Sequence, residues 1–279
     1  MEPVYTPVIA LARGLIKAMD WQVRVSGSGH IPRSGGAVIA TNHVGYLDFV
    51  FVGFGARPAG RLVRFMAKKE VFDHRISGPL MRGMKHLPVD RYGKPTEALD
   101  LAIDALRRGE VVGMFPEGTI SRSFVPRAGK TGAARMAMGA GVPLIPGAVW
   151  GSQRLLTKGR PRNLQRHVAI TVDFGPPIPY EPDDDPADVT RRLMDTITRL
   201  VEVAQTSYPQ QPAGDHDRWW LPAHLGGTAP TVEEVERMEN EERIQRRAAR
   251  RAARKAAEEA ARRAADGASR GVDQPEATT

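Results

Sequence analysis

The chain has 279 residues, 41% of them hydrophobic and none of them cysteine, which permits a sizeable core and excludes disulfides, thiolate metal sites and a cysteine nucleophile. The net charge of +8 lies entirely within residues 1–230, because the residues from 231 onward hold 11 basic and 11 acidic side chains. A basic folded body indicates an anionic partner, and no run approaches the roughly 18 apolar residues of a membrane-spanning helix.

Residues 4–19 predict an amphipathic helix, because their apolar side chains recur at helical spacing. Arg13 and Lys17 fall on the opposite side and make the polar face partly basic. A helix of this kind either lies in a membrane interface or covers the core of its own domain. The pattern alone leaves both alternatives open.

The next region alternates short apolar runs with helical patterns, which is typical of an α/β sheet covered on both faces. We expect strands in six runs, over 35–41, 61–67, 86–90, 111–115, 142–150 and 167–175. We expect helices over 95–109, 130–141 and 183–205. The first of these helices has Thr96 as its N-cap and Gly109 at its end.

The composition changes after the last of these helices. Residues 207–230 are typical of a linker, within which Trp219 and Trp220 either anchor at a membrane interface or pack on the domain. Residues 233–263 predict a long solvated helix, acidic first and then basic, and the end of the chain is expected to be disordered. The expected divisions are an interfacial helix over 1–21, an α/β domain over 22–206, the linker over 207–230 and a charged helical tail over 231–279.

The segment "ATNHVGYLDFVF" (40–51) places Asn42, His43 and Asp48 among apolar residues at the end of a predicted strand. Residues five apart on a regular helix lie about 140° away from each other, so His43 and Asp48 meet only if the chain turns between them. Gly45 permits such a turn. A histidine held by a carboxylate is a competent general base, whereas a histidine in an apolar segment is more often a hydrogen-bonded core residue.

Two further stretches point to an anion site. In "GMKHLPVDR", Arg91 directly follows a strand, and its guanidinium suits a phosphate or, equally, an ion pair with Asp90. In "MFPEGTISRS", a strand ends at Phe115 and Gly118 lets the backbone turn. The loop after it gathers hydroxyl and guanidinium donors and one carboxylate, from Glu117, Thr119, Ser121, Arg122 and Ser123.

The fourth stretch, "GVPLIPGAVWG", brackets an apolar strand with Pro143 and Pro146, which either shape a channel for a hydrocarbon chain or pack in the core. Two other motif matches carry no function. The G-x-S-x-G match at 267–271 lies in the polar tail without a preceding strand. The segment 128–131 resembles the end of a P-loop but lacks the first glycine, since Phe124 stands in its place.

These stretches, in this order, resemble the four motif blocks of the glycerolipid acyltransferase family, which includes the 1-acylglycerol-3-phosphate acyltransferases. Asn42, His43 and Asp48 match the first block, and Gly83 to Arg91 match the second. Phe115 to Thr119 reproduce the third block in full, and Val142, Pro143 and Pro146 match the fourth. The resemblance covers roughly residues 10–205 and makes 22–206 an acyltransferase domain. The sequence departs from the family at Ile120, where an arginine usually follows the threonine.

The resemblance implies a single mixed, mostly parallel sheet flanked by helices, and a reaction without a covalent acyl-enzyme. His43, oriented by Asp48, would take a proton from a glycerol hydroxyl that attacks the thioester of acyl-CoA or acyl carrier protein. Arg91, Thr119 and Arg122 would hold the acceptor's phosphate, with Glu117 and Gly118 in the same site. Asn42 and Gly45 would support the catalytic turn, and Pro143 and Pro146 the acyl pocket. Neither a metal nor a bound cofactor is implied.

The implied product is phosphatidic acid, made from 1-acylglycerol-3-phosphate by acylation of its sn-2 hydroxyl. The implied partners are lysophosphatidic acid, acyl-CoA, acyl carrier protein as a second donor, and an anionic membrane surface, without nucleic acid. The expected location is the cytoplasmic face of the cell membrane, as a peripheral or monotopic protein. Two alternatives stay open: a different acceptor, such as glycerol-3-phosphate or another lysophospholipid or glycolipid, and a non-catalytic lipid-binding module.

Overall fold

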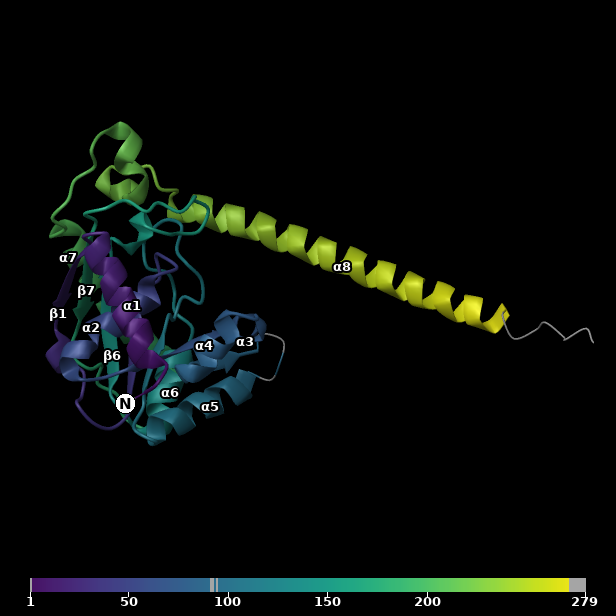
Figure 1. The fold of residues 1–279 in the computed structure, drawn as a ribbon, viewed down its shortest axis with the longest axis horizontal. Helices are drawn as coiled ribbons and strands as arrows, with labels where there is room; N and C mark the ends of the chain where they lie inside the picture. The colour runs from purple at the N-terminus through teal and green to yellow at the C-terminus, as the bar shows by residue number, and fades with distance from the viewer. Residues whose placement is uncertain (1, 91–92, 94, 271–279) are drawn as a thin grey trace, which may run out of the picture. The chain divides into compact units, whose positions relative to one another are not determined.

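The computed structural model describes residues 2–90, 93 and 95–270, and within them seven strands form one sheet (Figure 1). The strands are β1 (Gln22–Ser26), β2 (Ala37–Thr41), β3 (Val63–Lys68), β4 (Leu87–Val89), β5 (Val111–Met114), β6 (Leu144–Trp150) and β7 (Ala169–Phe174). Their order across the sheet is β1-β7-β6-β2-β5-β3-β4. β7 is antiparallel to β6 and β1 is parallel to β7, so these two strands run opposite to the other five. The predicted mixed, mostly parallel sheet is confirmed.

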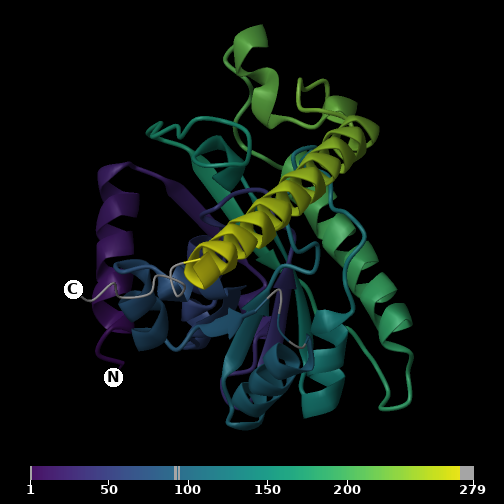
Figure 2. The same ribbon diagram turned by 90° about the vertical axis from the view of Figure 1, so that its right-hand side faces the viewer.

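Helices cover both faces of this sheet (Figures 1 and 2). The helices of the described residues before 230 are α1 (Tyr5–Ala18), α2 (Asp48–Gly55), α3 (Lys69–Asp73), α4 (Ser77–Gly83), α5 (Pro95–Arg107), α6 (Gly132–Ala140) and α7 (Pro186–Thr206). One core cluster lies between the sheet and α5, α6 and α7, and a second lies between the sheet, α2 and the end of α1. The candidate residues from Asn42 and from Phe115 onward follow β2 and β5, which are parallel and end at the same edge of the sheet.

The central strand shows why the pattern of apolar residues predicts this layering. All five residues of β2 are buried, because side chains alternate between two covered faces. Val38 and Ala40 face the cluster with α5–α7, whereas Ala37 and Ile39 face the cluster with α2. A strand of this kind appears in the sequence as a continuous apolar run.

The six predicted strands are all present, with ends that differ by one or two residues, but β1 was not predicted. Only Val23 and Val25 alternate with polar residues there, and β1 occupies the edge of the sheet, paired on one side with β7. An edge strand exposes much of its surface, so its apolar pattern is weak. The helix expected over 95–109 is α5, which begins at Pro95, so Thr96 lies within the helix and is not its cap.

Helix α1 packs on the domain, which is one of the two alternatives left open by its sequence. Tyr5 is buried and donates its hydroxyl to the carbonyl of Val63 at 2.8 Å, while Ile16 and Met19 pack against the second core cluster. Leu11 and Leu15, four residues apart, are 75% and 48% exposed. One apolar side of α1 therefore covers the domain, and a narrower apolar side, formed by Leu11 and Leu15, is exposed to solvent. No helix within the described ranges is long and apolar enough to cross a membrane.

The prediction of a linker over 207–230 is wrong for residues 207–229. These residues belong to the first of two compact units, which extends from Met1 to Ala229. Trp220 is fully buried and packs in a third cluster with Trp150 and Tyr208. Arg154 lies with its guanidinium 4.5 Å from the centre of the Trp220 ring. Aromatic burial thus holds residues 207–229 on the domain, so Trp220 packs rather than anchors at a membrane.

The second unit contains the helix α8 (Val232–Arg270). Thr231 and Glu234 cap its start reciprocally: each backbone N–H donates to the side-chain oxygen of the other residue. Pairs such as Glu242 and Arg246, four residues apart, lie along its surface. The helix extends to Arg270, so residues 268–270 are helical, and the remainder of the segment expected to be disordered lies outside the described residues.

Candidate active site

His43 and Asp48 meet at the end of β2, where the chain leaves the sheet and enters α2. The Nδ1 atom of His43 lies 2.9 Å from Oδ2 of Asp48, the first residue of α2. The His43 side chain is 18% exposed and that of Asp48 is fully buried. Because Nδ1 is engaged by the carboxylate, the ring carries its proton there and leaves Nε2 as the basic nitrogen.

The Asp48 carboxylate has a full set of donors. Besides His43, Oδ2 accepts from the backbone N–H of Val44 at 2.7 Å and of Gly45 at 2.9 Å. The other oxygen, Oδ1, accepts from the hydroxyl of Ser152. These bonds satisfy a buried charge and hold the carboxylate in one orientation.

Ser152 comes from a short 3₁₀ helix, η3 (Ser152–Arg154), that follows β6 after one glycine. The residues after η3 pack against the turn over 42–48. The carbonyl of Leu156 accepts from the Tyr46 N–H, and the Thr157 hydroxyl donates to the Val44 carbonyl. A Cβ on Gly45 would lie 3.1 Å from the carbonyls of Ser152 and Leu156. Gly45 does not adopt the left-handed conformation, so it is needed here for close packing rather than for the turn itself.

Asn42 fixes the start of the catalytic turn to β6. Its Oδ1 accepts from the Val149 N–H at 2.7 Å and its Nδ2 donates to the Val149 carbonyl at 3.0 Å. The side-chain amide of Asn42 therefore bonds to the backbone of β6 just beyond the last residue of β2 that pairs with it. His43 follows directly, so its position depends on this anchor.

Aromatic rings lie against one face of the His43 imidazole. The rings of His43 and Phe115 are stacked with centroids 4.0 Å apart and an interplanar angle of 9°. Phe65 lies nearly parallel behind Phe115 at 6.0 Å. The stack restricts rotation of the imidazole and keeps water from one face of the ring.

Glu117 is buried behind His43, where its carboxylate supports two backbone segments. Oε1 accepts from the His43 N–H at 2.9 Å, and Oε2 accepts from the Arg127 N–H at 3.3 Å. Burial raises the pKa of Glu117 to about 8, and the nearby charge of Asp48 adds to the rise. The Glu117 side chain thus joins the backbone at His43 to the backbone at Arg127.

The other residues predicted in this loop divide into two groups. Gly118 has a φ of +70°, and Thr119 and Arg122 are half-buried near the end of β5. Ser121 and Ser123 are buried and contact each other, so they are not available as anion donors. Ile120, where the family usually has arginine, is a buried apolar residue.

The two prolines predicted to line an acyl pocket do not come together. Pro143 is exposed at the start of β6, which is the edge of the sheet opposite to His43, because β2 and β6 are parallel. Pro146 is buried within the strand, paired with Ala40. The pocket prediction for Pro143 is therefore wrong, and Pro146 is a core residue. Arg91 lies outside the described residues.

Ser152 was not predicted from the sequence. The available signal was its place just after a buried strand, at the same sheet edge as His43, where polar side chains of parallel strands converge. Across the described ranges, no group of three His, Asp or Glu side chains gathers in a way that could hold a metal ion. The chemistry offered by this arrangement is that of an oriented general base.

Comparisons with known proteins place the chain among acyltransferases. A family model described as Acyltransferase matches residues 22–150. A 1-acyl-sn-glycerol-3-phosphate acyltransferase of Bacillus subtilis (strain 168) is 33% identical over 168 residues, which are 59% of this chain and 82% of the relative. An enzyme of the same name from Streptococcus pneumoniae is 26% identical over 220 residues, covering 75% of this chain and 78% of the relative.

The crystal structure of a 1-acyl-sn-glycerophosphate (LPA) acyltransferase from Thermotoga maritima has the same fold. It superimposes with a TM-score of 0.61 at 21% sequence identity, covering 74% of this chain and 81% of that chain. At this identity the match shows the fold alone.

Proposed function

Because the chain belongs to the acyltransferase family of the 1-acyl-sn-glycerol-3-phosphate acyltransferases, we propose that it acylates lysophosphatidic acid to phosphatidic acid. The acyl group would pass from acyl-CoA or acyl carrier protein to the sn-2 hydroxyl. The observation that carries this proposal is the His43 imidazole, bound at Nδ1 by the buried Asp48 and thereby basic at Nε2.

The reaction follows from that geometry. Nε2 of His43 takes the proton of the acceptor hydroxyl as its oxygen attacks the thioester carbonyl, which forms the new C–O bond. The C–S bond then breaks, and the thiolate takes up the proton from the imidazolium. Asp48 stabilises the charged ring between these steps without taking its proton. Base catalysis of this kind contributes about 10²–10⁴-fold, and positioning of the two substrates contributes further.

The acceptor phosphate would be held by Thr119, Arg122 and Arg91. Thr119 and Arg122 follow the strand that delivers Phe115 to His43, so a phosphate bound there would place its glycerol hydroxyls near Nε2. Arginine suits this task through paired donors and permanent charge. The buried Ile120 supplies no cation, so Arg122 would take the place of the arginine that the family usually has at position 120.

Membrane association would bring the protein to its lipid substrate. The exposed Leu11 and Leu15 of α1, with Arg13 and Lys17 exposed on the same helix, fit the boundary between headgroups and acyl chains. The basic body would favour anionic lipid. This supports a peripheral or monotopic location, on the cytoplasmic face where acyl-CoA and acyl carrier protein occur.

Release of free thiol tests the proposal. Purified protein with lysophosphatidic acid and a long-chain acyl-CoA is expected to release thiol and form phosphatidic acid, while His43→Ala is not. Replacing the acceptor with glycerol-3-phosphate, or the donor with acyl carrier protein, identifies the preferred substrates. Equal thiol release by wild type and H43A would reject the catalytic assignment and favour a non-catalytic lipid-binding protein.

A further inference from the structure

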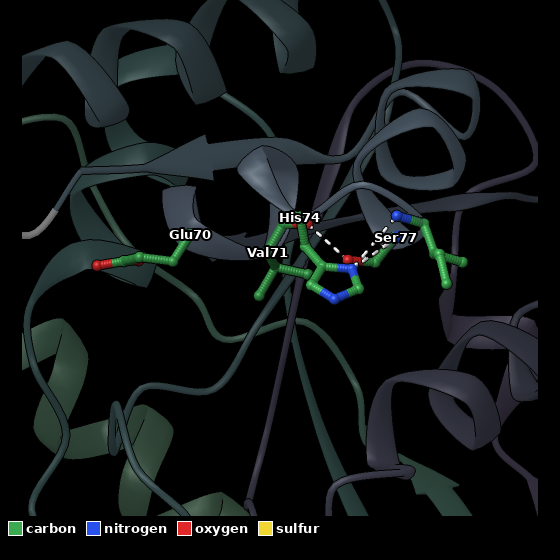
Figure 3. A pocket seen from close by; sticks show the side chains of 5 residues that line it. Glu70, Val71, His74 and Ser77 are labelled. Carbon is green, nitrogen blue, oxygen red and sulfur yellow. Dashed lines mark hydrogen bonds between the residues drawn. The ribbon is translucent and has the colours of Figure 1, made fainter.

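A second surface besides α1 exposes apolar side chains, and it lies between β3 and β4. Val71, Ile76 and Leu80 are 37%, 73% and 43% exposed on α3, α4 and the turn that joins them. Val71 and Ile76 line an apolar groove of about 440 Å³ together with Glu70, His74 and Ser77. Figure 3 shows the side chains of Glu70, Val71, His74 and Ser77, which line this groove.

The charges around the groove are mainly basic. Residues 68–85 contain five Lys or Arg side chains and two acidic ones, Glu70 and Asp73, and all seven are exposed. Along the chain, Lys69 lies two residues before Val71, and Arg75 directly precedes Ile76. Exposed apolar residues in a segment with excess basic charge are complementary to an anionic lipid surface, where acyl chains lie beneath negative headgroups.

The backbone of this segment is hydrogen-bonded internally at the turn. Nδ1 of His74 accepts from the N–H groups of Ile76 and Ser77, and the Ser77 hydroxyl donates to the Val71 carbonyl (Figure 3). Arg82 donates to the carbonyl of Phe72, which is itself buried as the anchor of α3. Insertion into an apolar boundary costs less free energy for a turn whose backbone N–H and C=O groups are hydrogen-bonded than for a loop whose groups are not.

The position of the segment connects it with both α1 and the catalytic site. The first turn of α1 lies beside α4 in Figures 1 and 2, and a Cβ on Gly83 would lie 2.7 Å from the Val4 side chain. β3 is parallel to β5, so α3 begins at the same sheet edge at which Phe115 reaches His43. A lipid held at this edge therefore lies near the reacting atoms.

We propose that α3 and α4 form a second membrane contact, which inserts Val71, Ile76 and Leu80 into the headgroup boundary of an anionic bilayer. This inference rests on the proposed function, because a lipid acceptor gives the site a reason to face the membrane. Two contacts beside each other would orient the protein, with the sheet edge that carries His43 toward the lipid. A single narrow apolar side on α1 would leave rotation about the helix free.

Vesicle binding of the full chain tests the inference without relying on activity. Ile76→Ser with Leu80→Ser is expected to weaken binding to phosphatidylglycerol–phosphatidylcholine vesicles at least tenfold. Lys69→Gln with Arg75→Gln is expected to weaken it about fivefold for each charge removed, and only on anionic vesicles. The matched control is Val203→Ser on α7, which is 60% exposed and is expected to bind as the wild type does.

Turnover of a short-chain, water-soluble lysophosphatidic acid separates this inference from the proposed function. The I76S/L80S and K69Q/R75Q variants are expected to keep wild-type turnover of this acceptor, which shows an intact fold and site. Wild-type protein that binds vesicles but turns over no acceptor would count against the proposed function alone. The second contact would be overturned if I76S/L80S and K69Q/R75Q bound vesicles as the wild type does while the double variant L11S/L15S did not bind. A changed oligomeric state of I76S/L80S with unchanged vesicle binding would also overturn it, by assigning the groove to a second copy of the chain.

Discussion

The hydroxyl of Ser152 donates to Oδ1 of Asp48, although the two residues are 104 positions apart in the chain. Oδ2 of the same carboxylate is hydrogen-bonded to Nδ1 of His43 and accepts from two backbone N–H groups. His43 is thus oriented by one carboxylate, and both oxygens of that carboxylate are held by donors. The direction in which the base points therefore depends on contacts from distant parts of the chain.

Removal of the His43 imidazole is expected to slow catalysis strongly and preserve the fold. His43→Ala should lower kcat by about 10²–10⁴-fold, because the acceptor hydroxyl loses its base. Asp48 would still accept from Val44, Gly45 and Ser152, so its buried charge stays satisfied. Thiol release measures the first effect and thermal unfolding the second.

The chain contains a matched control for this variant. His167 and Asp20 form another histidine–carboxylate pair at 2.6 Å, with both side chains more than half exposed. His167→Ala is expected to keep wild-type kcat. A similar loss of activity in H43A and H167A would show that the effect arises from something other than the base at the end of β2.

Loss of the Ser152 hydroxyl is expected to lower kcat by about 10–100-fold with little change in KM. A hydrogen bond to a buried charge contributes roughly 1.5–3 kcal/mol, and here it fixes the orientation of the base rather than substrate binding. Ser152→Ala tests this by steady-state kinetics. Ser152→Thr keeps the hydroxyl and should restore most of the rate, whereas an S152T variant as slow as S152A would contradict the role of the hydroxyl.

The control for Ser152 is another buried serine of the same region. Ser123 contacts Ser121 and makes no bond to His43 or Asp48. Ser123→Ala is therefore expected to change stability more than kcat.

Asn42→Ala is expected to lower both stability and activity. The substitution leaves the buried N–H and carbonyl of Val149 without their partner, which costs about 2–4 kcal/mol of the free energy of unfolding. It also releases the start of the turn that carries His43. Urea unfolding measures the first effect, with the peripheral Asn163→Ala as the control that should stay within about 0.5 kcal/mol.

The elevated pKa of Glu117 predicts a loss of stability as the pH rises. Its ordinary value of 4.5 is raised to about 8, so the folded protein binds a proton between these values that the unfolded chain does not. The stability of the wild type should therefore fall with increasing pH in this window, by an amount on the order of a few kcal/mol.

Glu117→Gln removes this titration while retaining an oxygen acceptor for the His43 N–H. Urea unfolding at pH 6, 7 and 8 should show the wild type losing stability relative to E117Q. Parallel pH profiles of the two proteins would contradict the protonated state of Glu117 in the fold.

His86 predicts the opposite dependence in acid. Burial, with Arg64 nearby, lowers the pKa of His86 from 6.5 to about 4, and its Nδ1 accepts from the Phe65 N–H. The unfolded chain binds a proton between these values and the folded protein does not, so stability is lost as the pH falls through the window. At pH 5 the loss should be about 2 kcal/mol relative to pH 7.

The measurement compares wild type with His86→Gln, whose amide oxygen can accept from Phe65 without titrating. The wild type should lose about 2 kcal/mol more than the variant between pH 7 and pH 5. An equal loss in both proteins would place the acid sensitivity in other groups.

The class of fold and the proposed base could be predicted from the amino-acid sequence alone. The buried strands appear as continuous apolar runs and the covering helices as 3.6-residue patterns, because each element shows its burial in its own residues. His43 and Asp48 are five positions apart, so one local turn brings them together. Features set within a dozen residues can be predicted from the order of residues alone.

The distant groups that complete the site follow from how the whole sheet packs. The Ser152 bond to Asp48 and the Asn42 bond to Val149 depend on β6 lying beside β2, a choice made by packing of the whole sheet. Because β2 and β6 are parallel, Pro143 lies at the edge of the sheet away from His43, although the sequence predicts both at one site. The burial of Trp220, which makes residues 207–229 part of the domain, likewise depends on Trp150 and Tyr208. Contacts of this kind arise from the summed burial of many side chains, so no short stretch of sequence specifies them.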